Sequence, residues 1–173
     1  MLEAIILIVF PFCMLFAAVS DMLSMTIANR VSIILVAAFV IVAPLTGMNG
    51  QAIAWHLAAG VIVLCATFIL FAFGGMGGGD AKLMSASAVW MGFGFNLIAY
   101  LVAASFLGGL LTLAVLAYRG SPLAVYTAGN RFLRNFTSDA KGVPYGIALG
   151  VAGIVVYPET PLMIWAMGKL ASG

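Results

Sequence analysis

Only 7% of this 173-residue chain is charged, and five of its residues are acidic. These five carboxylates are the first candidates for catalysis. Glu3 and Glu159 adjoin the outer ends of apolar segments, where water can solvate them. Asp139 lies in a polar stretch and is interpreted as a solvated loop charge. Asp21 directly follows a long apolar segment, and Asp80 opens a shorter one. An ionisable group there is costly to keep, so by default it marks a functional site.

Two carboxylates that meet can hydrolyse a peptide bond. The ionised one takes a proton from water, while the protonated one hydrogen-bonds the scissile carbonyl and then protonates the leaving amine. Two close carboxylates share one proton, since both cannot be charged together. Asp21 ends an apolar segment and Asp80 opens one, so helix dipoles favour Asp80 as the base and Asp21 as the acid. Such a pair titrates as a unit, which makes this assignment a preference only.

A glycine cluster, Gly74–Gly79 with Met76 as its one interruption, directly precedes Asp80. This backbone is not expected to form a stable helix, and at membrane depth irregular backbone lines water or is buried in protein. Glycine also permits the close approach that an extended substrate backbone needs. The rival interpretation is a phosphate-binding loop. It is disfavoured because no Gly-Lys-Ser/Thr follows and an aspartate stands where an anion would bind.

Composition places these residues in a membrane protein. The chain is 65% hydrophobic with a mean hydropathy of +1.22, whereas soluble domains are about half apolar and roughly a quarter charged. The scattered basic residues are interpreted as topology signals rather than a nucleic-acid surface. Cys13 and Cys65 lie in apolar runs and are interpreted as buried thiols, with no disulfide or zinc spacing. The lone His56 is assigned a structural role, and no cluster suggests a metal.

The apolar segments predict an all-α polytopic membrane helix bundle of about six spans in a single domain, residues 1–173. The spans are expected at 2–20, 31–45, 52–73, 81–93, 97–118 and 144–157. A last apolar piece, 162–170, follows two prolines and either lies at the interface or extends the sixth span past a kink. The polar stretch 119–143 is the sizeable loop, and its portion 131–134 is a candidate amphipathic helix at the membrane surface.

The charges predict the orientation. With the N-terminus outside, six of the seven basic residues fall on one side, which the positive-inside rule makes cytoplasmic. Asp21, Asp80 and Asp139 fall on that same side. The six basic residues are Arg30, Lys82, Arg119, Arg131, Arg134 and Lys141, while Lys169 lies on the other side with Glu3 and Glu159.

Three motifs then resemble those of a known family. Gly77-Gly78-Gly79-Asp80 matches the Gly-x-Gly-Asp signature of membrane aspartyl peptidases, and Ala81-Lys82-Leu83 extends it to the form of the prepilin peptidases, the type IV leader peptidase family. Asp21 followed by Ile27-Ala28-Asn29-Arg30 resembles the family's first aspartate with its Ile-Pro-Asn stretch, with Ala28 where proline is usual. Val143-Pro144-Tyr145-Gly146 resembles the proline-aromatic-glycine element that opens the last span.

The resemblance implies that Asp21 and Asp80 are the catalytic pair of an aspartic endopeptidase without a cofactor. It implies cleavage of prepilins and pseudopilins just before their hydrophobic segment, at the cytoplasmic face of the bacterial inner membrane. The chain resembles the short, peptidase-only members associated with Tad/Flp pili, without the N-terminal cytoplasmic module of larger members. The oligomeric state is left open.

The remaining candidate residues divide into two groups. Gly77, Gly78, Gly79 and Lys82 are expected to form the loop that meets the substrate, although Lys82 reads equally well as a positive-inside anchor. Asn29, Pro144, Tyr145 and Gly146 are expected to support the site, with Asn29 as a helix cap.

Other functions predict other features. A proton- or ion-coupled transporter would place its acids near the bilayer midplane, and a non-catalytic assembly subunit would tolerate the loss of both aspartates. A peptidase of the presenilin or signal-peptide-peptidase type would hold its first aspartate inside a span.

Overall fold

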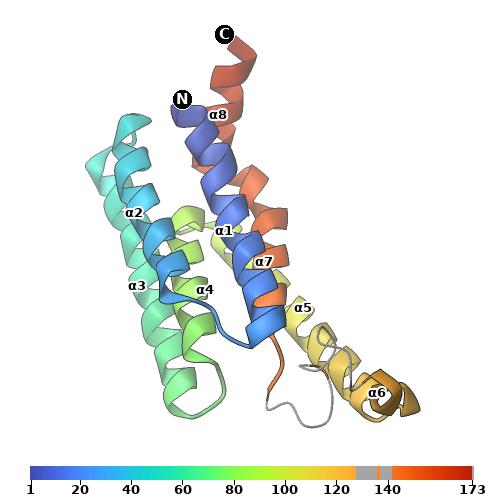
Figure 1. Ribbon diagram of the computed structural model, residues 1–173. Helices are drawn as coiled ribbons and strands as arrows, with labels where there is room; N and C mark the ends of the chain where they lie inside the picture. The colour runs from blue at the N-terminus through green and yellow to red at the C-terminus, as the bar shows by residue number, and fades with distance from the viewer. Residues whose placement is uncertain (128–135, 137–141, 173) are drawn as a thin grey trace.

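Helices make up most of the residues that the computed structural model describes, which are 1–127, 136 and 142–172 (Figure 1). No strand occurs in these residues, so the predicted all-α membrane bundle is confirmed. The helices are α1 Leu2–Ser24, α2 Asn29–Leu45, α3 Gly50–Ala72, α4 Gly78–Met91, α5 Phe95–Arg119, α6 Pro122–Thr127, α7 Tyr145–Val156 and α8 Pro161–Ser172, with a 3₁₀ turn, η2, at Tyr157–Glu159 between the last two.

The helices differ in their capacity to cross a membrane. Within the described part of the chain, α1, α3 and α5 are long and apolar enough to do so by themselves. The segment Tyr145–Glu159 and α8 reach that length together, with a bend of 52° at the predicted proline break. The shorter α4 has 14 residues and is therefore about 21 Å long, less than the roughly 30 Å apolar layer. The six predicted spans thus correspond to six helices of unequal reach.

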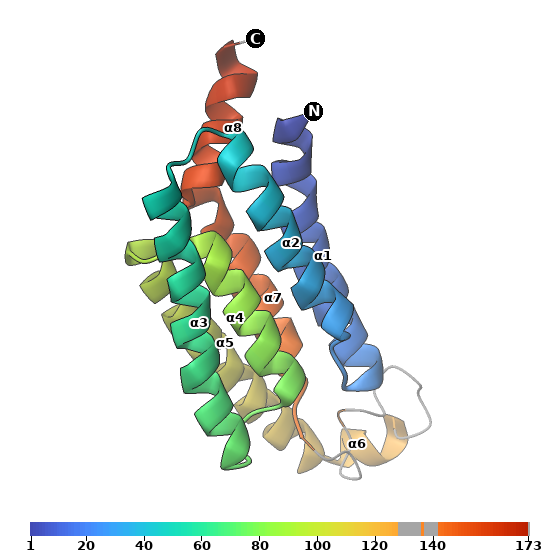
Figure 2. The same ribbon diagram turned by 90° about the vertical axis from the view of Figure 1, so that its left-hand side faces the viewer.

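Successive long helices run in opposite directions, and both chain termini lie at the end of the bundle opposite α6 (Figures 1 and 2). The closest packing joins α3 to α4, α1 to α7 and α5 to α7. These directions bring Asp21, Asp80, Arg30, Lys82 and Arg119 to one end, and Glu3, Glu159 and Lys169 to the other. The relative sorting of these charges therefore agrees with the prediction, while the side that faces the cytoplasm stays a prediction.

Some sequence predictions concern residues that the structure does not describe. Asp139, Arg131, Arg134, Lys141 and the candidate amphipathic helix 131–134 lie outside the described residues.

An aromatic core sets the axial positions of the helices that carry the two aspartates. Trp90 of α4 is fully buried, and its Nε1–H donates to the Leu35 carbonyl of α2 at 2.9 Å. Its ring lies 5.5 Å from that of Phe10 on α1 and 5.9 Å from those of Phe39 and Tyr157. Because each ring comes from a different element, a shift of α4 along α1 would disrupt these contacts.

The sequence predicts a structural role for His56 and buried positions for the two cysteines. The His56 ring is buried, with Nδ1 2.8 Å from the Val89 carbonyl and the ring stacked on Phe39. These contacts fit the structural role predicted for it. Cys13 is buried as expected, but Cys65 is exposed on the outer surface of α3, so the prediction of two buried thiols is wrong for Cys65.

Candidate active site

Asp21 lies inside the last turns of α1 rather than after the helix. The helix continues four residues beyond the predicted end of the first span and stops where Met25 adopts a left-handed conformation with φ of 53°. Asp21 is only 6% exposed, so its carboxylate is directed into the protein. A helix long enough to cross a membrane therefore carries this acid.

Gly146 at the start of α7 holds the Asp21 carboxylate. Its backbone N–H donates to Asp21 Oδ2 at 2.7 Å, across 125 positions of sequence. A methyl group added at Gly146 would lie 2.8 Å from Asp21 Cβ, 2.9 Å from Oδ2 and 2.9 Å from Ile27 Cδ1. Only glycine allows this approach, so the residue positions Asp21 through its backbone and not merely through helix packing.

Asp80 lies in the first turn of α4. The helix begins at Gly78 with Gly77 as its N-cap, so the glycine cluster is helical at Gly78 and Gly79, contrary to the prediction. The Asp80 carboxylate lies against the backbone of Gly77, because a methyl group added at Gly77 would lie 2.6 Å from Asp80 Oδ2. A carboxylate at the third helical position, facing the N-cap residue, has the placement of the backward half of a capping box. A side chain at Gly77 would therefore displace the Asp80 carboxylate.

Gly79 brings the two acid-bearing segments together. A methyl group at Gly79 would lie 3.1 Å from Ile27 Cβ and 3.4 Å from the Ile27 backbone N and O. The α1–α2 connection therefore lies directly against the first turn of α4. This close packing places the end of α1 beside Asp80.

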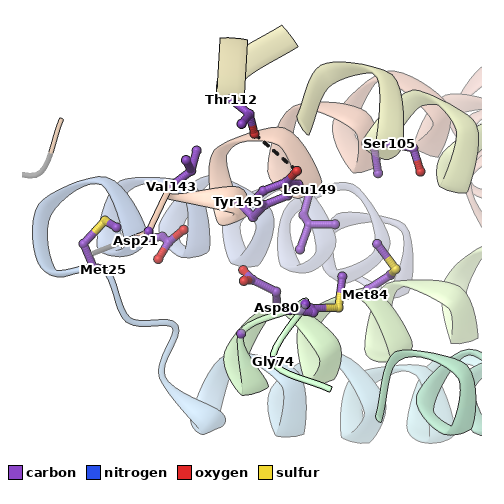
Figure 3. Close-up of a pocket in the computed structure, with 15 residues that line it drawn as sticks. Asp21, Met25, Gly74, Asp80, Met84, Ser105, Thr112, Val143, Tyr145 and Leu149 are labelled. Carbon is purple, nitrogen blue, oxygen red and sulfur yellow. Dashed lines mark hydrogen bonds between the residues drawn. The ribbon is translucent and has the colours of Figure 1, made fainter. Parts of the chain in front are cut away.

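The two aspartates face a common cavity of about 590 Å³ (Figure 3). Their carboxylates point toward one another from α1 and α4. A smaller cavity of about 280 Å³ touches both acids on the side of the α1–α2 connection and Gly77–Gly79. Beside the acids, the main cavity is lined by Met25, Gly74, Gly75, Met76, Gly77, Met84, Ala104, Ser105, Thr112, Gly142, Val143, Tyr145 and Leu149.

Tyr145 forms the wall of this cavity that joins α7 to α5. A methyl group at Gly108 would overlap the Tyr145 ring, so the ring lies directly on the α5 backbone. The Thr112 hydroxyl donates to the Gly108 carbonyl at 2.8 Å and lies 3.3 Å from Tyr145 Oη. Arg119 at the end of α5 donates to the Gly142 carbonyl at 2.6 Å. The entry to α7, with Pro144 as its buried N-cap residue, is thereby anchored to α5.

Lys82 and Asn29 lie outside the cavity. Lys82 Nζ donates to Asn29 Oδ1 at 2.9 Å, and both side chains are exposed. The N-cap of α2 is Ala28 and not Asn29, so the expected capping role of Asn29 is wrong. The pair instead ties the first turns of α2 and α4 together at the rim of the site.

The helix-dipole argument for base and acid fails on this geometry. Asp21 belongs to the end of α1, but its carboxylate accepts a hydrogen bond from the first turn of α7. Asp80 lies in the first turn of α4. Both carboxylates are therefore at helix N-termini, and the dipoles no longer distinguish the two acids.

Several cavity residues were not singled out by sequence reasoning. Met84, Ser105, Thr112 and Leu149 sit in apolar helices, where residue type alone gives no signal. Gly108 lies four residues after Ala104, and such a small-residue spacing indicates close helix packing without indicating a site. Within the described residues, no group of three His, Cys, Asp or Glu side chains can hold a metal ion.

Comparison with known proteins identifies one family. A family model described as the type IV leader peptidase family matches residues 8–113, which is more than half of the chain. The matched region contains both aspartates and the glycine cluster, and it ends before α7. No curated protein and no solved structure matches the chain.

Proposed function

The chain belongs to the type IV leader peptidase family, and from that membership we propose that it is an aspartic endopeptidase with Asp21 and Asp80 as its catalytic pair. The observation that carries the proposal is the meeting of these two carboxylates in one cavity, from helices far apart in sequence. Family membership implies peptidase activity in general. The aspartic mechanism is inferred from the chemistry of the pair.

The reaction follows from two carboxylates that share one proton. A water molecule between them loses a proton to the ionised carboxylate and attacks the scissile carbonyl carbon. The protonated carboxylate hydrogen-bonds the carbonyl oxygen as negative charge develops there. Collapse of the tetrahedral intermediate breaks the C–N bond, and the leaving amine takes a proton from the pair. The Gly146 N–H occupies Asp21 Oδ2, which leaves the other oxygen of Asp21 for water.

The glycine turn gives the substrate room. Gly74, Gly75 and Gly77 line the cavity with backbone alone. An extended peptide can approach closely at these glycines, with its scissile carbonyl beside the pair.

The substrate and setting are proposed from the family and from the charge sorting. The substrates are prepilins or pseudopilins, and the products are a leader peptide and a shortened precursor for pilus assembly. Residues 1–173 act as a single transmembrane peptidase domain. With Arg30, Lys82 and Arg119 at the same end as the acids, that end faces the cytoplasm of a bacterial inner membrane.

The rival functions fit the site less well. A transporter would carry its acids near the middle of the bundle, whereas Asp21 lies in the last turn of α1 and Asp80 in the first turn of α4. A structural subunit leaves unexplained why Gly146 and Gly77 leave no room for a Cβ beside the two carboxylates. The position of Asp21 inside α1 no longer separates the chain from presenilin-type peptidases, but the family match does.

One reconstitution separates these functions. The purified chain is placed in vesicles that contain a pH-sensitive dye, together with a membrane precursor bearing a leader peptide. We expect a single cut that releases the leader, identified by mass spectrometry, and no change in proton permeability. Proton flux without cleavage would contradict the peptidase function and favour a transporter. The absence of both would favour an assembly subunit.

A further inference from the structure

The helices α4 and α5 form an open hairpin beside the two aspartates. Only residues 92–94 connect them, yet α4 packs mainly on α3 and α5 packs mainly on α7. Figure 1 shows α5 diverging from α4 toward the end where the acids lie. We call this space the α4–α5 wedge, and its walls are Met84 on α4 and Ala104, Ser105 and Thr112 on α5.

The wedge is the side of the catalytic cavity that opens between helices. Its walls line the same cavity as Asp21 and Asp80. Ser105 is exposed and faces this space, although it lies in the middle of a helix long enough to cross a membrane. The opening therefore leads sideways, from the acids toward the lipid around α5.

The walls of the wedge carry no charge, except where α4 begins and α5 ends. In α4 the charged residues are Asp80 and Lys82, both in the first turns, and in α5 the charged residue is Arg119 in the last turn. Lys82 and Arg119 thus stand at the polar end of the bundle, and the remainder of both helices is uncharged. Such a surface suits an apolar occupant.

We infer that the α4–α5 wedge receives the apolar transmembrane helix of the substrate, which enters sideways from the bilayer. A peptide held across the two aspartates has one end at the polar end of the bundle and the other in the wedge. Backbone that faces lipid must satisfy its own hydrogen bonds, so the segment in the wedge must be helical and apolar. The inference rests on the proposed peptidase function, because it concerns how the substrate reaches the same pair.

This arrangement explains how the enzyme selects its cleavage position. The helical part of the substrate is not cleaved, because its hydrogen-bonded backbone is not accessible to attack. The first extended peptide bonds beyond the helix end then lie beside Asp21 and Asp80. Cleavage is therefore expected at a fixed distance from the start of the apolar helix, even when the leader sequence changes.

Photo-crosslinking tests the occupant of the wedge. A photoreactive phenylalanine analogue replaces Ser105 in one chain and Phe106 in the matched control, both in an Asp80→Asn background that holds the precursor uncut. Phe106 is the next residue of α5, about 100° around the helix, and it is 70% exposed. The probe is a precursor with a leader followed directly by one apolar helix of about 20 residues, in the same vesicles.

We expect Ser105 adducts within the first turns of the precursor's apolar helix, and we expect them to be several-fold more abundant than adducts from Phe106, which lies on another face of α5. Equal labelling from both positions, labelling from Phe106 alone, or no precursor adduct at Ser105 would overturn the inference. Adducts to a second copy of the chain would assign the wedge to self-association and also overturn it. Cleavage of the same precursor by the unsubstituted chain is measured in parallel. Cleavage without Ser105 adducts refutes only the wedge, whereas no cleavage refutes the proposed function.

Discussion

The substitution Gly146→Ala tests how Asp21 is held. The new methyl group would lie 2.8–2.9 Å from Asp21 Cβ, Asp21 Oδ2 and Ile27 Cδ1, closer than non-bonded atoms normally approach. Either the carboxylate or the start of α7 must move, and the 2.7 Å bond from the Gly146 N–H lengthens or breaks. A hydrogen bond to a charged group contributes about 1.5–3 kcal/mol. A catalytic group misplaced by about 1 Å costs roughly 100-fold in rate.

We therefore expect Gly146→Ala to lower the rate of precursor cleavage by about 10- to 100-fold, at unchanged abundance in the membrane. The assay is the initial rate of leader release in vesicles, with the protein level measured by immunoblot. Gly109→Ala on α5 is the matched control, because a methyl group there meets no atom within 4 Å. Cleavage by Gly146→Ala at the rate of this control would refute the assigned role of Gly146.

Four further predictions concern the surroundings of the pair. Gly108→Ala displaces the Tyr145 ring and should lower the cleavage rate several-fold. Tyr145→Phe loses only a 3.3 Å hydroxyl contact and should change the rate by no more than about twofold. Equal rates for the two variants would contradict the role of the Tyr145 ring as a wall of the cavity. Lys82→Met removes the exposed bond to Asn29 and should change the free energy of unfolding by less than about 1 kcal/mol, as measured by chemical unfolding in detergent. Gly150→Ala places a methyl group 2.8 Å from the Met14 carbonyl and should destabilise the α1–α7 contact by about 1–3 kcal/mol; an unchanged unfolding midpoint would argue against that contact. A metal chelator should leave the initial rate of cleavage unchanged, and loss of cleavage that zinc restores would contradict the two-carboxylate mechanism.

Hydropathy predicts most of the helices, and the two aspartates beside the apolar runs lead to the proposed chemistry. The apolar runs locate six helices of unequal length because lipid requires apolar, hydrogen-bonded backbone. Their ends are less predictable, since caps and not hydropathy determine them. In α1 the helix passes through Asp21 and stops only at the left-handed Met25. In α4 the helix begins within the glycines, where the Asp80 carboxylate lies against Gly77.

Contacts between distant segments are the part of the site that sequence could not supply. The motif at Gly146 was expected to support the site, but nothing in its spacing indicates a bond to Asp21. The packing of the Tyr145 ring on Gly108 depends on the relative position of α5 and α7. For the same reason the helix-dipole argument no longer supports an assignment of base and acid, because it considered each aspartate on its own helix and ignored the neighbouring α7.

The central claim is that Asp21 and Asp80 act as one catalytic unit, and the rates of Asp21→Asn, Asp80→Asn and the double variant test it most directly. Leader release is measured in vesicles at equal protein abundance, with Glu159→Gln at the opposite end of the bundle as the control. Groups that act together are strongly non-additive, so each single variant should fall to the same residual rate as the double variant, while the control cleaves normally. Substantial cleavage by either single variant would contradict the claim.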